Sequence, residues 1–299
     1  MAKIYVSALY CYPIKSCKGY ALHEAITDAR GIAGDRGMMI VDACGEFVSQ
    51  RKAPRLALVA PQPHADGAVT LSAPGMPSLS FHPGDAGRRV KVRVWGDVCE
   101  AVDQGDAVAE WLQAFLAAPV RLVCMAEGFE RRVDWRYARR ESDQTGFSDG
   151  YPFLLISQAS LDALNARLAA PVPMNRFRPS IVVSGCLPFA EDDWGDFRIN
   201  GILFSAVKPC ARCVVPTIDQ DTGEAGPEPL RTLATFRTFG QKVLFGQNLV
   251  AAGTGILRVG DEVEIVTRTN AAPRVPEVGR RSTFQPTPSG RGTSRGKLS

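Results

Sequence analysis

Short apolar runs separated by glycine, proline and aspartate recur over the first 125 residues, and their spacing is the strongest constraint on the fold. The runs are too short for ordinary helices. The one at residues 90–95 alternates apolar and basic side chains, as the two faces of a strand require. Strands are predicted at residues 4–6, 38–41, 56–59, 69–71 and 90–95. Many short strands joined by turns are typical of a sandwich or barrel.

The pattern changes near Asp103. Residues 106–116 carry apolar side chains at helical spacing after an acidic start, and residues 120–123 are predicted to form a strand that closes the unit. Residues 126–147 are rich in charge and poor in aliphatic side chains, which favours an exposed connecting loop. We therefore predict a first domain at residues 1–125.

The second part of the chain mixes strands with helices. A buried strand at residues 152–157 precedes a helix predicted at 158–168, with Ser157 as its N-cap, and residues 230–237 are predicted to form a short helix. Further strands are predicted at residues 180–183, 202–207, 255–257 and 262–266. These elements predict a second, β-rich domain with inserted helices at residues 126–267.

Residues 268–299 consist mainly of Pro, Gly, Ser, Thr and Arg. Such a composition buries too little apolar surface to offset conformational entropy, so we predict a disordered basic tail. The tail carries seven Lys or Arg against one acid, Glu277, so the formal net charge of +4 leaves −2 on residues 1–267. The body therefore lacks the charge of a nucleic-acid-binding surface, and the tail has one aromatic residue, Phe284, to stack on bases. No nucleic-acid partner is expected.

No apolar run approaches the length of about 18 residues that a membrane span needs. The first residues pass directly into a strand-like alternation and reach Pro13, unlike a signal peptide. A cytoplasmic protein without a membrane span is therefore expected. In a reducing compartment, a chain with a large core needs no disulfides. Most cysteines are accordingly expected to be free and semi-buried: Cys11, Cys17, Cys44, Cys99, Cys124 and Cys186.

The remaining two thiols, Cys210 and Cys213, stand three positions apart between Pro209 and Pro216. A thiolate is a soft metal ligand and a nucleophile, and an adjacent arginine and lysine favour the deprotonated form. A zinc half-site lacks its second half, because the three histidines lie far upstream: His23, His64 and His82. A dithiol redox pair is a further alternative, although such motifs open a helix, whereas this one follows a predicted strand.

Basic residues in several separate loops predict a phosphate site. A guanidinium fork matches phosphate oxygens, and a hydroxyl adds a donor. Lys15 and Ser16 share one loop, Arg36 follows in another, and Arg178 lies just before a buried strand. The alternatives are that Lys15 and Arg36 are solvated loop charges and that Arg178 fixes a loop through carbonyl contacts.

Several motifs in order carry a family resemblance: 12–19 (YPIKSCKG), 34–36 (GDR), 49–51 (SQR), 175–179 (NRFRP), 191–194 (EDDW), 209–213 (PCARC), 219–223 (DQDTG) and 245–248 (FGQN). The chain resembles MOSC-domain proteins that carry the N-terminal MOSC β-barrel domain. This family includes the mitochondrial amidoxime-reducing component and its bacterial YcbX-like relatives, and the resemblance covers about residues 3–267. It implies an α+β, predominantly β fold, with an N-terminal β-barrel-like domain and a β-barrel MOSC domain with inserted helices.

The resemblance also implies a molybdenum cofactor, in which one pterin dithiolene and one protein cysteine hold the metal. By family position, Cys213 is the metal ligand and catalytic residue. Lys15, Ser16 and Arg36 match positions that contact the pterin phosphate. The other implied cofactor-binding residues are Asn175 and Arg178 in the loop that holds the pterin, together with Asp149, Cys210 and Asn248. Pyridoxal phosphate binding, a family-level association, is not expected here.

The implied function is that of an oxidoreductase that reduces small N-hydroxylated compounds by oxygen-atom transfer. No cysteine follows Cys213 to hold an iron–sulfur cluster, so a separate electron donor is expected: a ferredoxin, a flavin reductase or a cytochrome b5-like protein. The alternative is a sulfur or molybdenum-cofactor carrier that uses a persulfide or thiolate of Cys213.

Overall fold

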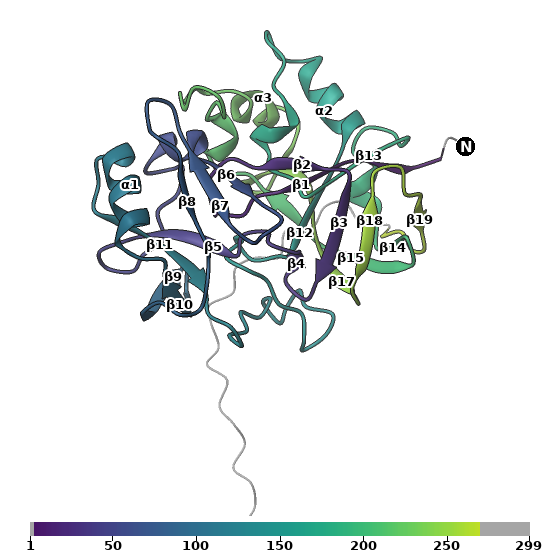
Figure 1. Cartoon of the computed structure of the whole chain (residues 1–299). Coiled ribbons are helices and arrows are strands. Elements are labelled where there is room, and N and C mark those ends of the chain that lie inside the picture. Colours follow the sequence, from purple (N-terminus) through teal and green to yellow (C-terminus); the bar gives the residue numbers. More distant parts are fainter. Residues whose placement is uncertain (1–2, 270–299) are drawn as a thin grey trace, which may run out of the picture.

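The computed structural model describes residues 3–269, and strands dominate it (Figure 1). The largest sheet runs in the order β19-β14-β15-β17-β12-β13-β1-β2, with β16 paired to β17. Its strands are β19 (Val263–Ile265), β14 (Asp196–Ile199), β15 (Ile202–Ala211), β17 (Lys242–Ala252), β12 (Phe153–Ser157), β13 (Ile181–Ser184), β1 (Tyr5–Cys11), β2 (Tyr20–Leu22) and β16 (Thr238–Phe239). This predominantly β architecture agrees with the fold class predicted from the sequence.

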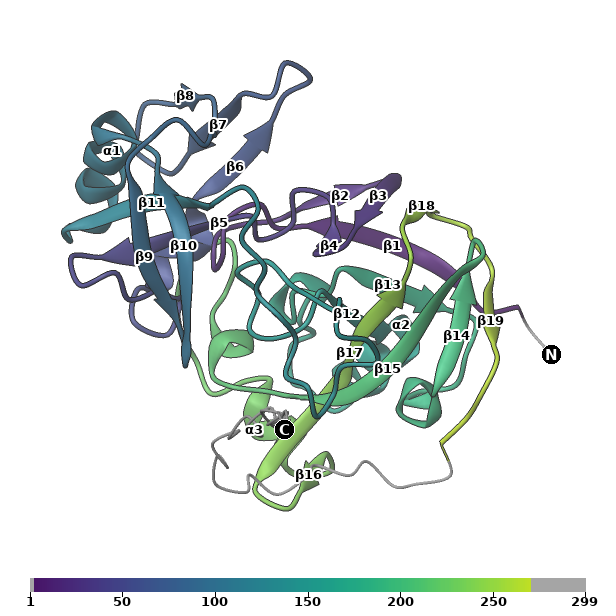
Figure 2. The same cartoon turned by 90° about the horizontal axis from the view of Figure 1, so that it is seen from below.

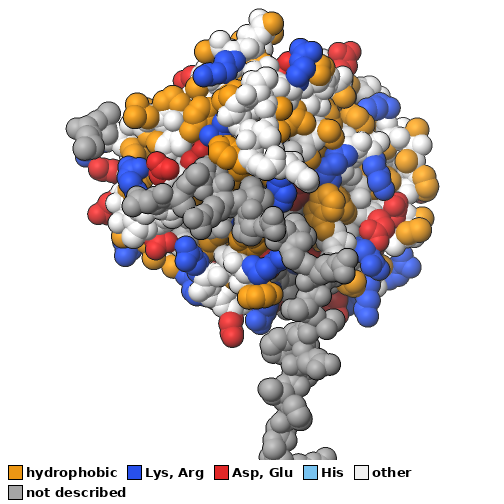
Figure 3. Space-filling model, turned by 180° about the vertical axis from the view of Figure 1, so that it is seen from behind, with side chains coloured by type: hydrophobic (Ala, Val, Ile, Leu, Met, Phe, Trp, Pro, Cys, Tyr) orange, Lys and Arg blue, Asp and Glu red, His pale blue; other side chains and the backbone are white. Residues whose placement is uncertain are grey.

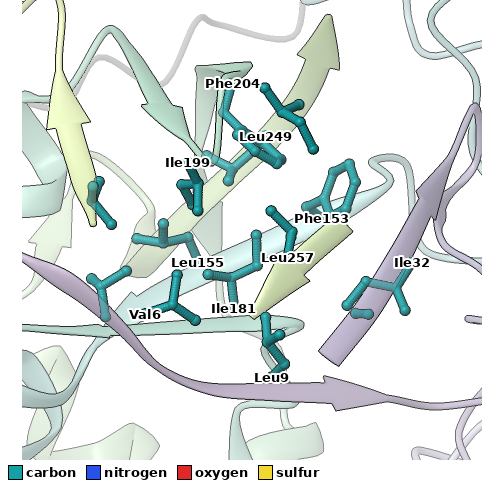
Figure 4. Packing of buried hydrophobic residues seen from close by; sticks show 14 of the residues in the cluster. Val6, Leu9, Ile32, Phe153, Leu155, Ile181, Ile199, Phe204, Leu249 and Leu257 are labelled. Carbon is teal, nitrogen blue, oxygen red and sulfur yellow. The ribbon is translucent and has the colours of Figure 1, made fainter. Parts of the chain in front are cut away.

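The first strands of the chain belong to the same sheets as its last ones. Strand β1 pairs antiparallel with β13, and β3 (Glu24–Asp28) pairs with both β4 (Gly31–Ile32) and β18 (Gly255–Arg258). Figure 4 shows the resulting core, where Val6 and Ile32 lie among side chains from the second half such as Leu155 and Leu249. The first strands of the unit predicted at residues 1–125 therefore pack into the hydrophobic core of the second unit.

The segment from β5 to β11, which lies between the first and the last strands of the chain, forms a separate group of two small sheets and one α-helix (Figure 2). One sheet has the order β5-β11-β10-β9 and another the order β6-β7-β8. The helix α1 (Asp106–Leu116) buries Leu112 and Phe115 in this unit. The strands are β5 (Met38–Asp42), β11 (Val120–Met125), β10 (Asp97–Asp103), β9 (Arg89–Val94), β6 (Ala60–Pro63), β7 (Val69–Ser72) and β8 (Leu79–Phe81).

Helix predictions were confirmed where local signals are strong. The helix α1 has the predicted bounds, and α2 (Gln158–Asn165) begins as predicted, with Ser157 Oγ accepting a hydrogen bond from the Ser160 backbone N–H. It ends three residues early, and α3 (Leu230–Ala234) is also shorter than predicted.

Two predictions in the first half were wrong. Residues 56–59 do not form a strand, because they lie mainly in the 3-10 helix η1 (Pro54–Leu58). Pro54 explains this, since its fixed φ suits the first turn of a helix and its missing N–H costs nothing there. Cys44 is exposed rather than semi-buried, because it lies in a tight turn after β5. All eight cysteines are free.

None of the helices within residues 3–269 is long and apolar enough to cross a membrane. On the face seen from behind, Lys and Arg side chains are interspersed with acidic and hydrophobic ones (Figure 3). The disordered tail predicted for residues 268–299 lies outside the described residues except for positions 268 and 269.

Candidate functional site

Eight of the nine predicted site residues line one open cavity: Lys15, Ser16, Arg36, Asp149, Arg178, Cys210, Cys213 and Asn248. They arrive from the loop between β1 and β2, the loops before β5, β12 and β13, the end of β15, and β17. Asn175 is the exception, because it lines a second cavity together with Tyr12 and Arg178. The tertiary structure therefore gathers residues that are more than 200 positions apart.

Three of the cavity residues have left-handed backbone conformations. The φ angles are +68° at Ser16, +46° at Arg36 and +57° at Arg178. This region is unfavourable for residues with a Cβ, and such strain persists where surrounding contacts impose it, often at functional sites. Ser16 and Arg36 both sit in short loops that backbone hydrogen bonds hold in place, including Arg36 N to Tyr12 O at 2.8 Å.

Lys15 is nearly fully buried, and its side chain pairs with that of Asp149. Lys15 Nζ donates to Asp149 Oδ1 at 2.6 Å, and the Arg51 guanidinium lies 3.6 Å from Asp149 Oδ2. Burial lowers the pKa of Lys15, and the Asp149 carboxylate opposes that shift. Desolvation would raise the pKa of Asp149, but Lys15 and Arg51 outweigh it and lower that pKa. Lys15 is thus a paired cation inside the cavity and not a solvated loop charge.

Arg36 and Arg178 lie side by side. Arg36 Nη1 donates to Asp35 Oδ2 at 2.5 Å, and Arg36 Nη2 donates to the Arg178 carbonyl at 3.1 Å. Arg178 Nη2 is buried without a hydrogen-bond partner among the described residues. Burial and the nearby Arg36 lower the pKa of Arg178 to about 10. An unpaired buried guanidinium is costly, so Arg178 is suited to receive an anion and does not serve to tie a loop through carbonyls.

The two thiols occupy the end of β15 and the turn that follows it. Desolvation raises the pKa of Cys210, although the neighbouring Arg212 opposes it. Arg212 Nε and Nη1 donate to the carbonyls of Phe245 at 2.8 Å and Phe177 at 3.1 Å. Its Nη2 is a second buried guanidinium nitrogen without a partner among residues 3–269. The other basic residue next to the thiols in the sequence, Lys208, places its Nζ over the Tyr137 ring, 4.1 Å from the ring centroid.

The cavity is also lined by three cations that were not predicted from the sequence as site residues: Arg51, Arg176 and Arg212. Each lies in a motif of the family resemblance, which is the signal that identifies them. Arg176 is held by the Pro216 carbonyl at 2.8 Å and by Asp219 Oδ2 at 3.1 Å, which gives the acidic turn after the cysteines a structural role. Among the described residues that line the cavity, six are Lys or Arg and one is an acid.

These residues fit the molybdenum cofactor that the resemblance implies. Its phosphate is anionic, and the cavity offers an excess of cations, two of them with unpaired buried donors. A thiol at Cys213 is available as a soft ligand beside them. Within residues 3–269, no three His, Cys, Asp or Glu side chains come together as a metal site of their own.

Comparisons with known proteins identify the family of the chain. Residues 3–119 match the MOSC N-terminal beta barrel domain, and residues 142–264 match the MOSC domain. Human mitochondrial amidoxime-reducing component 1 is 37% identical over 279 residues, covering 87% of this chain and 82% of the relative. The protein of the same name from Xenopus laevis is 36% identical over 283 residues, covering 88% and 82%. Mitochondrial amidoxime reducing component 2 from Bos taurus is 33% identical over 276 residues, covering 86% and 82%. The chain therefore belongs to the family of MOSC-domain proteins with an N-terminal MOSC β-barrel domain, the family of the mitochondrial amidoxime-reducing components.

Proposed function

We propose that this protein is a molybdenum-cofactor-dependent oxidoreductase that reduces small N-hydroxylated compounds. The observation that carries the proposal is the meeting of Cys213 with six cations in one cavity. The names of the relatives, which are amidoxime-reducing components, supply the substrate class. In the overall reaction, an amidoxime takes up two electrons and two protons and yields an amidine and water.

Five residues have proposed roles in holding the cofactor. Lys15, Ser16 and Arg36 would bind its phosphate, and Arg178 would supply a further guanidinium through Nη2, which has no partner among the described residues. Cys213 ligates the metal through its thiolate. When bound, the cofactor supplies the two-electron redox chemistry at the N–O bond, while the protein orients and tunes it.

The polypeptide contributes charge and order around the site. Asp149 keeps the Lys15 ammonium in position by pairing with it at 2.6 Å, and also lies near Arg51. Tyr151 lines the same cavity and packs edge-on against Tyr137, 6.0 Å between ring centroids. The Tyr151 ring gives a planar N-hydroxylated group an apolar surface to contact in the cavity.

We further propose that electrons come from a separate protein: a ferredoxin, a flavin reductase or a cytochrome b5-like donor. The cytoplasmic location remains a prediction from the sequence. The alternative is a sulfur or molybdenum-cofactor carrier that uses a persulfide or thiolate of Cys213. A sulfur carrier predicts no bound molybdenum, and a cofactor carrier predicts molybdenum without reductase activity, so the experiment below separates both from the enzyme.

The test uses the full-length chain purified from a host that makes the molybdenum cofactor. We expect molybdenum close to one atom per chain and reduction of benzamidoxime to benzamidine with an artificial reductant. Cys213→Ser should lower molybdenum content and activity by at least about 10-fold, because loss of a metal ligand should cost no less than loss of a residue that only orients one. Cys44→Ser, at an exposed turn outside the cavity, should change neither. Full molybdenum in Cys213→Ser would refute the ligand assignment. A labile sulfur adduct without molybdenum would support the carrier.

A further inference from the structure

One aromatic ring contacts both guanidiniums of the proposed phosphate site. The Cζ atoms of Arg36 and Arg178 lie 4.4 Å and 4.3 Å from the centroid of the Tyr12 ring. Tyr12 itself is almost fully buried, with 2% of its surface exposed. The face of an aromatic ring carries negative potential and attracts cations at these distances. Tyr12 therefore interacts favourably with two like charges at once.

The ring is held in place from several directions. Tyr12 N donates to Asp35 Oδ1 at 2.7 Å, and the same carboxylate accepts from Arg36 through its other oxygen. The backbone N–H of Arg36 donates to the Tyr12 carbonyl at 2.8 Å. Gly19 leaves room for the ring, because a Cβ there would lie 2.3 Å from Tyr12 Cδ1. The position of the ring and that of Arg36 are thus set together.

The two guanidiniums need such a neighbour, because only one of them has a carboxylate. Asp35 pairs with Arg36, whereas Arg178 forms no salt bridge within residues 3–269. Two buried like charges repel each other strongly in a low-dielectric site. Without a ring between or beside them, the expected response is that one side chain turns away and the site loses a donor.

The phenol hydroxyl is not what the site uses. Tyr12 Oη is buried and has no hydrogen-bond partner among the described residues. A buried hydroxyl without a partner costs stability, so the ring is the part of the side chain with a favourable role. The contribution of the ring can therefore be measured apart from that of the hydroxyl, whereas a substitution that removes the whole side chain would mix the two.

We propose that Tyr12 is a positioning residue whose ring holds Arg36 and Arg178 together, so that both guanidiniums bind one phosphate group. This inference rests on the proposed function, in which that phosphate belongs to the cofactor. Tyr12 thus acts by positioning the two arginines and does not itself contact the cofactor.

The test compares Tyr12→Phe, which keeps the ring, with Tyr12→Met, which keeps a similar volume without a π face. The full-length chain is purified without cofactor, and binding of inorganic phosphate is measured by calorimetry. We expect Tyr12→Phe to bind within about twofold of wild type and Tyr12→Met to bind about tenfold more weakly. In an Arg178→Gln background, Tyr12→Met should cost clearly less, because one of its two partners is gone.

A purely structural role would lower the melting temperature without this pattern, so melting curves accompany each measurement. If Tyr12→Met does not fold, Gly19→Ala displaces the ring without replacing any of the cations, and it should also weaken phosphate binding. Wild-type phosphate affinity in Tyr12→Met, or equal losses in Tyr12→Phe and Tyr12→Met, would overturn the proposal. Absence of molybdenum from wild-type protein would refute the proposed function instead, while the phosphate comparison would still decide the role of Tyr12.

Discussion

Lys15 Nζ and Asp149 Oδ1 lie 2.6 Å apart although 134 positions separate them in the chain. The pair joins the loop after β1 to the loop before β12. The Asp149 carboxylate opposes the lowering of the Lys15 pKa by burial, and so favours the ammonium form, which binds an anion better than a neutral amine does. The charge of the site thus depends on a contact between two distant segments.

Asp149→Asn should destabilise the protein in a pH-dependent way. The Asp149 carboxyl is 63% exposed, so solvent screens the pair and we expect a loss of about 1 kcal/mol in the free energy of unfolding at pH 7. Because the charges of Lys15 and Arg51 lower the pKa of Asp149, its contribution is present above the unfolded pKa of about 3.9 and disappears as pH falls through the folded value. Urea unfolding at pH 7 and at about pH 3 checks this.

The matched control is Glu262→Gln, which breaks an exposed ion pair with Lys3 outside the cavity. Its effect at pH 7 should be close to zero. Identical unfolding curves for Asp149→Asn and wild type at pH 7 would contradict the structural role of the pair.

Arg178→Gln should lower cofactor binding without lowering the stability of the cofactor-free chain. The substitution removes a buried, unpaired guanidinium whose pKa burial and Arg36 already lower, so the cofactor-free chain should be as stable as wild type or more stable by about 1 kcal/mol. Molybdenum content should nevertheless fall by about tenfold or more, because a charge-assisted donor to the phosphate is lost. Metal analysis tests the predicted loss of molybdenum, and thermal melting of the same preparations tests the predicted stability.

Arg167→Gln is the control for Arg178→Gln, since Arg167 lies just after α2 over the Phe236 ring and outside the cavity. It should leave molybdenum content unchanged. Equal molybdenum in Arg178→Gln and Arg167→Gln would show that Arg178 does not bind the cofactor.

Cys210 should react more slowly with an alkylating reagent than the exposed Cys44 does. Desolvation raises the pKa of Cys210, so at pH 7.5 it should remain a thiol and resist alkylation by iodoacetamide, while the exposed Cys44 reacts readily. Mass spectrometry after a short exposure gives the ratio. Cys210→Ser should accordingly keep more than about half of the wild-type molybdenum, whereas Cys213→Ser should not. Rapid alkylation of Cys210 would contradict this ordering.

Truncation should be tolerated after Thr269 but not before Thr267. Thr267 Oγ1 accepts from Asp196 N at 2.7 Å, and Thr269 N donates to the Asp193 carbonyl at 2.7 Å, so these residues extend the pairing beyond β19 along the segment that leads into β14. A chain lacking residues 270–299 should melt within about 2 °C of wild type and retain its activity. A chain lacking residues 266–299 should melt several degrees lower. Loss of activity in the shorter deletion would give the tail a function that we do not expect.

Elements with strong local signals were predictable from the sequence. The helix α1 has an acidic first turn and apolar residues at helical spacing, and α2 has a serine cap, so both could be placed without knowing their neighbours. Strand β17, the longest in the protein at 11 residues, was not predicted. Its segment Gly246-Gln247-Asn248 is polar and resembles a loop. Only pairing with β12 and β15 makes it a strand, and Gly246 is needed because a Cβ there would lie 2.8 Å from the Leu155 carbonyl.

The sequence by itself determined the kinds of group at the site, because a thiol, a lysine and several arginines in ordered motifs carry chemistry wherever they lie. Only the tertiary structure decided which of them meet. It placed Lys15, Arg178 and Cys213 in one cavity and Asn175 in another, and it left Nη2 of Arg178 and Arg212 without hydrogen-bond partners within residues 3–269. The physical reason is that charge pairing, burial and unpaired donors depend on distances between segments, which no local pattern in the chain encodes.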